Sequence, residues 1–402
     1  MLVSKNFGDI VTFTRASARW RFSSGGVLVQ DAANVPSLDY DPITLAPRGM
    51  LVEDSRTNLL WPSMYSGTVA PAYYDITNAN SLISGGTGKR FVAKGTGGAP
   101  ASSIGGNGFT DAAQKVAWAI VESDPLSAAG AVTQLVLYRT VPSSGFAASV
   151  NFNLTNFTAS GSGSYGAFKI SDVGPNGGKV YVIWTSYTAV AGETIWTYPY
   201  PIVTNGAAQT GQSLFVHHAQ TELGAYPSSP IVTTTAQATR ASESATITDL
   251  SKIGFSQGEG TVYAEFVVPR LAAGIVGDTM QGVLTITDAA LNNYFSVGVG
   301  ATGACSLYRK GAASPAALSS ANLLIPGSVA KVAFCYGSAQ NDAICLNGGA
   351  VASGSAGNPS GMTEMRLGRF AGNPGWLNGW LRNARYIPRR MSNTELQTLT
   401  TL

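Results

Sequence analysis

Short runs of alternating hydrophobic and polar residues, separated by turn-forming residues, fill the chain from residue 61 to residue 235. Four runs rich in β-branched and aromatic residues lie at 115–121, 132–138, 179–185 and 213–217. Clusters of glycine, serine, proline and asparagine stand between them, among others at 143–145, 160–163 and 174–178. Many short strands with glycine-rich turns and no long helical period predict a β-sandwich or jelly roll.

The same pattern returns between residues 240 and 402. Strands are predicted where β-branched and aromatic residues cluster again, at 260–268, 330–336 and 343–349. One short helix is predicted near the end, because Ser392 and Glu395 have the spacing of a capping box. Met391 and Leu396 stand at the positions of the accompanying hydrophobic staple. The small, polar stretch 233–245 suits a boundary between two domains.

Composition narrows the class of protein. Of the 402 residues 45% are hydrophobic, which is enough for several cores and argues against disorder. Only 12% are charged, against about 25% in an average soluble domain. Because the net charge is only +3, we expect no general binding of nucleic acid. The chain holds no run of 18 apolar residues and starts without the apolar run of a signal peptide, so we expect no membrane insertion and folding in a cytoplasm.

Charged residues divide the chain into three regions. Residues 1–60 hold six basic and six acidic residues, and residues 61–235 hold seven of each. Residues 236–402 hold twelve basic and nine acidic residues, so the whole net charge lies there. We therefore predict an all-β protein with two β-sandwich (jelly-roll) domains, 61–235 and 236–402, preceded by an N-terminal bracing segment, 1–60, and ending in one short C-terminal helix.

Metal and cofactor chemistry find little support. The three cysteines, Cys305, Cys335 and Cys345, have no zinc-site spacing, and we expect reduced thiols packed as small apolar groups. His217 and His218 are neighbours on a predicted strand, so their rings point to opposite faces and do not readily share a metal. Structural roles are favoured for both over an interface or ligand contact. We predict no metal site and no cofactor.

Two pairs of acidic residues deserve comparison with a glycosidase. Such an enzyme needs two carboxylates across a sugar, about 5–9 Å apart. Asp39 and Asp41 could share one strand face, and Glu53 and Asp54 are adjacent. Five arginines lie in the same 60 residues, so ion pairs that fix a compact fold are favoured over catalysis. Neither a G-x-S-x-G nor an H-E-x-x-H motif occurs, and no catalytic residue is predicted.

Aromatic residues in polar surroundings are the best candidates for ligand contact. A sugar ring can stack its C–H face on an aromatic ring, and this chemistry suits a protein with few charges. Trp184, Trp196 and Tyr198 are the predicted glycan-binding residues, with packing in a sandwich core as the alternative for each. Six arginines between Arg366 and Arg390 could form a basic patch, or else lie along a solvated strand face.

Two stretches, together with the C-terminal part, resemble structural proteins of tailed bacteriophages. The first comprises residues 13–17 (FTRAS), 26–28 (GVL), 34–36 (NVP), 39–42 (DYDP), 45–53 (LAPRGMLVE) and 56–60 (RTNLL). The second, residues 220–231 (QTELGAYPSSPI) and 239–241 (TRA), is similar to the end of a carbohydrate-binding-module-like jelly roll. Residues 367–369, 377–386 and 392–396 resemble the end of a concanavalin/laminin-G-like sandwich.

The resemblance implies a non-catalytic virion protein that is assembled in the host cytoplasm. A tail-fibre or head-fibre subunit is favoured, with host surface polysaccharide and other virion proteins as partners. The chain has no coiled-coil or triple-β-spiral shaft, so a compact appendage is favoured over an elongated fibre. Because phage proteins of this kind often trimerise, the resemblance also implies a homotrimer. A capsid decoration protein and a tailspike depolymerase that cleaves surface polysaccharide remain as alternatives.

Overall fold

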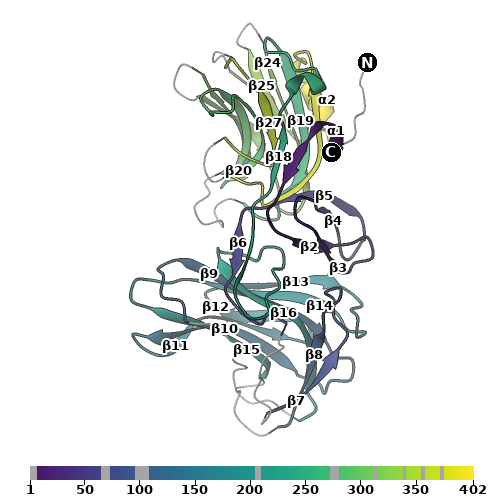
Figure 1. The fold of residues 1–402 in the computed structure, drawn as a ribbon, viewed down its shortest axis with the longest axis vertical. Coiled ribbons are helices and arrows are strands. Elements are labelled where there is room, and N and C mark those ends of the chain that lie inside the picture. The colour runs from purple at the N-terminus through teal and green to yellow at the C-terminus, as the bar shows by residue number, and fades with distance from the viewer. Residues whose placement is uncertain are drawn as a thin grey trace.

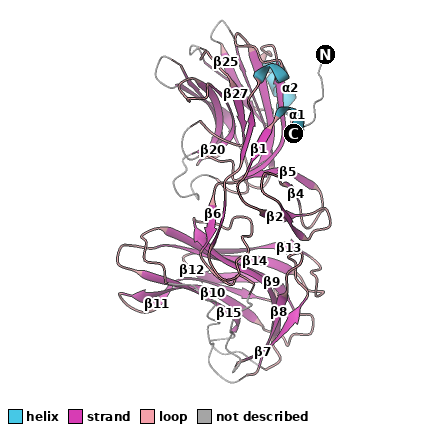
Figure 2. Ribbon diagram, viewed as in Figure 1, coloured by secondary structure: helices cyan, strands magenta, loops and turns pink. Residues whose placement is uncertain are grey.

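Strands are the main elements of the fold, with 53% of the residues in strands and 5% in helices. A computed structural model describes residues 7–64, 73–95, 108–203, 210–271, 280–311, 316–337, 341–354, 358–371 and 375–402. Two β-sandwiches lie one above the other along the long axis, and the short helices lie on the upper sandwich (Figures 1 and 2). The prediction of an all-β protein built from sandwiches is confirmed.

The lower sandwich is the jelly roll. Its smaller sheet has the strand order β12 (Thr158–Ser162), β11 (Gly145–Asn153), β10 (Val132–Val141) and β15 (Thr194–Val203). Its larger sheet has the order β13 (Ser164–Ser171), β14 (Val180–Thr188), β9 (Gln114–Ser123), β16 (Ser213–Leu223), β8 (Gly88–Ala93) and β7 (Tyr74–Ala79). The inward side chains of both sheets, Leu135, Phe152 and Leu214 among them, form one dry core.

The upper sandwich consists of two seven-stranded sheets. One runs β1 (Thr12–Thr14), β18 (Ser244–Ile247), β27 (Glu364–Leu367), β20 (Met280–Thr287), β21 (Tyr294–Gly300), β22 (Ala304–Lys310) and β23 (Ala316–Leu323). The other runs β26 (Ala352–Gly354), β25 (Asp342–Leu346), β24 (Val329–Tyr336), β19 (Gly260–Val267), β28 (Gly379–Ile387), β5 (Pro47–Val52) and β4 (Leu38–Tyr40). Val52 packs with Phe266 and Phe334 in the shared core.

The N-terminal segment connects the two sandwiches. Its strands β1, β4 and β5 belong to the sheets of the upper sandwich. The hairpin β2 (Arg19–Phe22) and β3 (Leu28–Asp31) instead packs Leu28 against Trp118 and Val182 on the outer face of the larger jelly-roll sheet. The strand β6 (Arg56–Asn58) pairs with β17 (Ala238–Arg240) where the chain crosses between the sandwiches (Figure 1). The three-part division at residues 60 and 235 stays a prediction, but β1, β4 and β5 complete sheets whose other strands come after residue 240.

The helices are short and peripheral. The helix α2 (Asn393–Thr400) has the predicted capping box between Ser392 and Glu395. A single turn, α1 (Phe7–Ile10), and a 3-10 turn, η1 (Leu250–Ile253), accompany it. Within the described ranges, no helix has the length and apolar character that crossing a membrane requires. The three cysteines are free and buried, as expected.

Candidate functional site

The three predicted glycan-binding aromatics lie on opposite sides of the jelly roll. Trp196 and Tyr198 belong to β15 in the smaller sheet, whereas Trp184 belongs to β14 in the larger sheet. All three are half-buried, and Trp184 also packs against the apolar cluster that contains Trp118 and Val182. The structure therefore brings Trp196 and Tyr198 together and places Trp184 at a second location.

Alternation along β15 creates an aromatic stripe on the outer surface of the smaller sheet. Ile195 and Thr197 are buried and point into the sandwich, where Thr197 Oγ1 lies 2.7 Å from Thr221 Oγ1 of the opposite sheet. Trp196, Tyr198 and Tyr200 occupy the alternate positions and therefore face outward. Tyr200 was not among the three predicted residues, although its parity on the strand matches that of Trp196 and Tyr198.

Cross-strand register extends this stripe into a surface that we call the aromatic face. Three rows of side chains on the outer side of the sheet cross β15, β10 and β11: Trp196–Tyr138–Phe146, Tyr198–Val136–Ser149 and Tyr200–Gln134–Asn151. Val136 and Ser149 of the middle row are buried by their surroundings. Rings occupy one end and side-chain amides the other, where Gln134 Nε2 donates to Asn151 Oδ1 over 2.7 Å. None of the nine side chains carries a charge.

The rings of the aromatic face touch one another and leave polar groups free. Trp196 and Tyr198 lie 6.4 Å apart between centroids with an interplanar angle of 9°, and Tyr138 lies 5.5 Å from Tyr198. Among the described residues, the hydroxyls of Tyr138, Tyr198 and Tyr200 have no hydrogen-bond partner. Burial raises the pKa of Tyr198 and of Tyr200, so both hydroxyls stay protonated at neutral pH and can donate. Flat apolar rings beside these hydroxyls, and beside amides that keep further donors and acceptors, are what a neutral sugar requires.

Trp184 faces a cavity of about 680 Å³ between the two sandwiches, which we call the interdomain cleft. The outer face of the larger jelly-roll sheet supplies one wall through Phe168 and Trp184. The hairpin β2–β3 supplies Trp20, and the upper sandwich supplies Trp380 and Arg270. A Cβ on Gly166 would lie 2.9 Å from Trp184 Nε1, so the absence of a side chain there lets the indole lie against β13.

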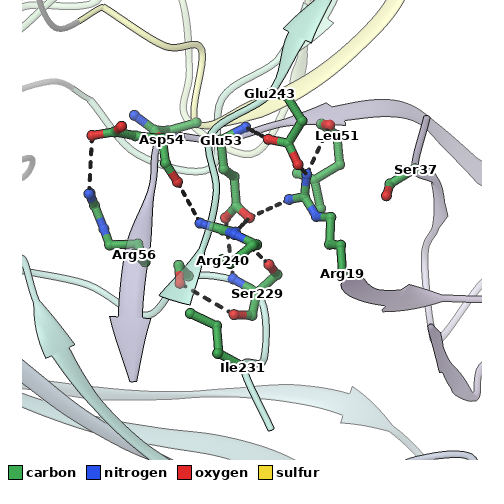
Figure 3. Close-up of polar contacts among 12 residues, drawn as sticks. Arg19, Ser37, Leu51, Glu53, Asp54, Arg56, Ser229, Ile231, Arg240 and Glu243 are labelled. Atoms are coloured by element: carbon green, nitrogen blue, oxygen red, sulfur yellow. Dashed lines mark hydrogen bonds and ion pairs between the residues drawn. The ribbon is translucent and has the colours of Figure 1, made fainter. Parts of the chain in front are cut away.

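A buried cluster of charges, which we call the polar junction, lies at one side of this cleft. Figure 3 shows its contacts. The junction comprises Arg19, Glu53, Arg240 and Glu243, and Glu53 itself lines the cleft. Glu53 pairs with both Arg19 and Arg240, while its backbone N–H donates to Glu243 over 2.8 Å. Burial alone would raise the pKa of Glu53, but the two guanidinium groups outweigh it and lower that pKa to about 2. Arg19 and Glu53 precede the jelly roll and Arg240 and Glu243 follow it, so the junction closes a loop around that domain.

The acidic pair Asp39 and Asp41 also lines the cleft, but its oxygens are engaged. Asp39 accepts from the backbone N–H of Phe22 and from Trp380 Nε1, each over 2.8 Å. Burial raises the pKa of Asp39 in spite of these bonds. Asp41 accepts from two backbone N–H groups of its own turn and pairs with Arg48 at 2.8 Å. These contacts favour the predicted structural role of both residues.

Other predicted candidates also have structural partners. His217 Nε2 lies 2.9 Å from Glu122 Oε2, and His218 packs 5.0 Å from the Trp118 ring, both fully buried. The six C-terminal arginines do not form an open basic patch, because each has a local partner. These contacts are Arg366–Glu364, Arg382–Glu265, Arg389–Glu395, Arg369–Trp376, Arg385–Tyr263 and Arg390 with the carbonyl of Asn341. Across the described ranges, no group of three or more His, Cys, Asp or Glu residues could hold a metal ion.

No protein-family model matches the chain, and no curated protein matches its sequence. A heptameric SAP-like pentraxin from Limulus polyphemus is 13% identical over 35% of this chain and 68% of its own, with a TM-score of 0.28. The CBM40 of the Ruminococcus gnavus IT-sialidase is 13% identical over 36% and 84%, with a TM-score of 0.29. Domains LG4-5 of the mouse laminin alpha1 chain are 10% identical over 86% and 91%, with a TM-score of 0.25. At such scores these likenesses carry no function over to this chain.

Proposed function

We propose that this protein is a non-catalytic glycan-binding subunit whose aromatic face binds neutral sugar residues. One observation carries the proposal: Trp196 and Tyr198, half-buried and nearly parallel, lie on the outer face of a sheet beside tyrosine hydroxyls that have no partner among the described residues. A core role would enclose these rings in the sandwich, and strand parity turns them outward. The rings supply the apolar contact, and the hydroxyls and the Gln134–Asn151 pair supply hydrogen bonds.

The setting of this activity is proposed to be a tailed-bacteriophage virion. The support is the resemblance of residues 11–60 to phage structural proteins, together with the position of that segment as a brace between two sandwiches. A tail-fibre or head-fibre subunit that meets host surface polysaccharide, in a homotrimer with other virion proteins nearby, is the form we propose. A capsid decoration protein would instead occur in many copies over the shell, so counting copies and locating them on purified particles separates the two.

Binding of the purified full chain to extracted host polysaccharide and to neutral oligosaccharides tests the proposal. Saturable binding is expected, with a loss of about 30-fold in affinity for Trp196→Ala, the effect of removing one aromatic anchor worth about 2 kcal/mol. Tyr165→Ala is the matched control, because Tyr165 is an exposed aromatic on the opposite sheet. Equal affinity of Trp196→Ala and the unmodified chain would contradict the proposal that the aromatic face binds sugar.

The same binding reactions also test the alternative that the protein is a depolymerase. Release of oligosaccharides over hours would show cleavage and direct attention to Asp39 and Asp41 in the cleft. We expect no release, because a general acid must present its proton to a glycosidic oxygen and both oxygens of Asp39 already accept hydrogen bonds. Asp39→Asn is the variant that decides whether any release observed belongs to this chain.

A further inference from the structure

Positive charge in the interdomain cleft is almost fully compensated. Five cationic side chains line it: Arg21, Arg48, Lys169, Arg270 and Arg382. Four have a carboxylate partner at 2.6–2.8 Å: Arg21 with Asp31, Arg48 with Asp41, Lys169 with Asp172 and Arg382 with Glu265. Among the described residues that line the cleft, Arg270 is the one cation without a carboxylate within 4 Å.

The contacts of Arg270 leave one edge of its guanidinium unused. Its Nη1 donates to the carbonyl of Pro227 over 3.0 Å, and the group lies 5.2 Å above the centroid of the Tyr226 ring. Its Nε is buried and has no hydrogen-bond partner within the part of the chain that the structure describes. Because this Nε is enclosed by protein atoms, a carboxylate in the cleft meets the guanidinium through Nη2, in a charge-assisted hydrogen bond.

The nearby acids cannot serve as this partner because they are already engaged. Glu53 pairs with Arg19 and Arg240 in the polar junction. Glu222 accepts from Trp118 Nε1 over 3.1 Å and from Ser228 Oγ over 2.6 Å. Burial lowers the pKa of Arg270 although Glu53 and Glu222 act in the opposite direction, which marks a cation short of counter-charge.

Aromatic rings continue from Arg270 into the cleft. Tyr226, beneath the guanidinium, lies 5.0 Å from Trp184 between centroids, at an angle of 59°. This chain of Arg270, Tyr226 and Trp184 runs from the upper sandwich to the larger jelly-roll sheet. The cavity of about 680 Å³ lies within the range of about 300–1,000 Å³ that is typical of small-ligand sites.

We propose that the interdomain cleft is a second saccharide site, specific for a carboxylate-bearing sugar whose acid group pairs with Arg270 while its ring lies against Tyr226 and Trp184. The proposal rests on the glycan-binding function given above and adds a charged ligand class at a separate location. The acids of the cleft do not repel such a ligand strongly, because Asp39, Asp41 and Glu53 are each hydrogen-bonded or paired.

The test is calorimetry of the full chain with uronic-acid trisaccharides of the galacturonate and glucuronate types and with their methyl esters. Esterification removes the charge and keeps the rings. We expect the acids to bind at least about tenfold more tightly than the esters, the effect of one charge-assisted contact. Arg270→Gln should abolish this preference, and Arg270→Lys, which keeps the charge without the fork, should restore only part of it. Equal affinity for acids and esters, or no binding of any acid in the panel, would overturn the proposal.

Two further variants separate this inference from the proposed function. Trp196→Ala should weaken neutral sugars and leave the acid preference intact, whereas Trp184→Ala should weaken the acids and leave the neutral ligands of the aromatic face intact. Loss of acid binding in Trp196→Ala would show a single shared site and contradict the second one. Neutral binding that is lost in Trp196→Ala but survives in the cleft variants, with no acid binding by any chain, would contradict the cleft site and leave the aromatic face supported. The unfolding transition of each variant is recorded, and one that has lost its fold is replaced by Arg270→Met or Trp184→Phe.

Discussion

The aromatic face and the interdomain cleft are both lined by aromatic rings, yet they are built in different ways. The aromatic face lies on three adjacent strands of one sheet, β15, β10 and β11, and none of its side chains is charged. The cleft takes its walls from the N-terminal hairpin, the larger jelly-roll sheet and the upper sandwich, and charged side chains surround it. One surface depends on strand pairing within a domain, and the other depends on how two domains are held together.

Because the two sites are built differently, they should respond differently when the contact between the sandwiches is weakened. A site on a sheet surface persists as long as the sheet does, because the backbone ladder fixes the spacing of its side chains. A site between domains exists only while their contact holds, and here that contact depends on the hairpin packed at Trp118 and on the polar junction around Glu53. Changes at the junction should therefore act on the cleft and leave the aromatic face unaffected.

Glu53→Gln should have the largest effect, because it leaves the buried guanidinium groups of Arg19 and Arg240 without their shared carboxylate. Breaking a buried ion pair from one side costs about 3–5 kcal/mol. We expect a loss of this size in the free energy of unfolding of the upper sandwich, measured by urea denaturation. Acid-sugar binding should weaken with it, and neutral-sugar binding should be retained.

Asp75→Asn provides the control for that variant. Asp75 pairs with Lys94 at the surface, where the two side chains are 69% and 37% exposed, so its loss should cost less than about 1 kcal/mol. If the two substitutions destabilised the protein equally, the polar junction would not be the element that holds the cleft.

Lowering the pH should weaken the polar junction of the unmodified chain, because it protonates Glu53. The pKa of Glu53 is lowered to about 2, so its stabilising contribution is present above its ordinary value near 4.5 and is lost as the pH falls toward 2. The full shift corresponds to about 3 kcal/mol, at about 1.4 kcal/mol per pKa unit. We expect the unmodified chain to lose this much more stability than Glu53→Gln between pH 6 and pH 2, as measured by denaturation at each pH. Parallel pH profiles of the two chains would contradict the assignment to Glu53.

The two regions also differ in how far the sequence predicts them. Trp196 and Tyr198 could be selected from the sequence, because both stand in polar company within a predicted β-rich domain. Tyr138 and Gln134 could not, because they join the face only through pairing with a strand about 60 residues away. Local sequence does not specify which strands become neighbours, since register depends on the packing of the whole sandwich.

The interdomain cleft could not be predicted from local sequence, because its residues come from distant parts of the chain. Its aromatic and cationic groups, among them Trp20, Trp184, Arg270 and Trp380, are spread over 360 residues of the chain and meet only after the domains dock. Trp184 was predicted as a ligand contact, but nothing in its neighbourhood shows that it faces another domain. Among the described residues that line the cleft, Arg270 is distinguished from the other cations by having no carboxylate partner, which is a property of the fold. The capping box at Ser392, in contrast, is a local signal, and the structure has it as predicted.

Gln134→Ala should produce a smaller and more selective change on the aromatic face. Its amide donates to Asn151 beside Tyr200, and one neutral hydrogen bond contributes about 1 kcal/mol, or about fivefold in affinity. We expect this loss for neutral oligosaccharides and no change for acidic ones, measured by calorimetry. Gln397→Ala, which removes a similar side-chain bond in the upper sandwich, is the control and should change neither.

Ionic strength should give the smallest effect and the finest distinction between the two regions. Salt screens a charge–charge contact, since the Debye length falls from about 10 Å at 0.1 M to about 3 Å at 1 M. Arg270 is half-buried, so screening of its contact with a carboxylate is incomplete, and we expect acid-sugar affinity to fall only about two- to fivefold over that range. Neutral sugars meet no charge on the aromatic face, so their affinity should stay constant in the same titrations. A salt effect of equal size on both ligand classes would show that they share one charged environment, which the uncharged rows of β15, β10 and β11 do not provide.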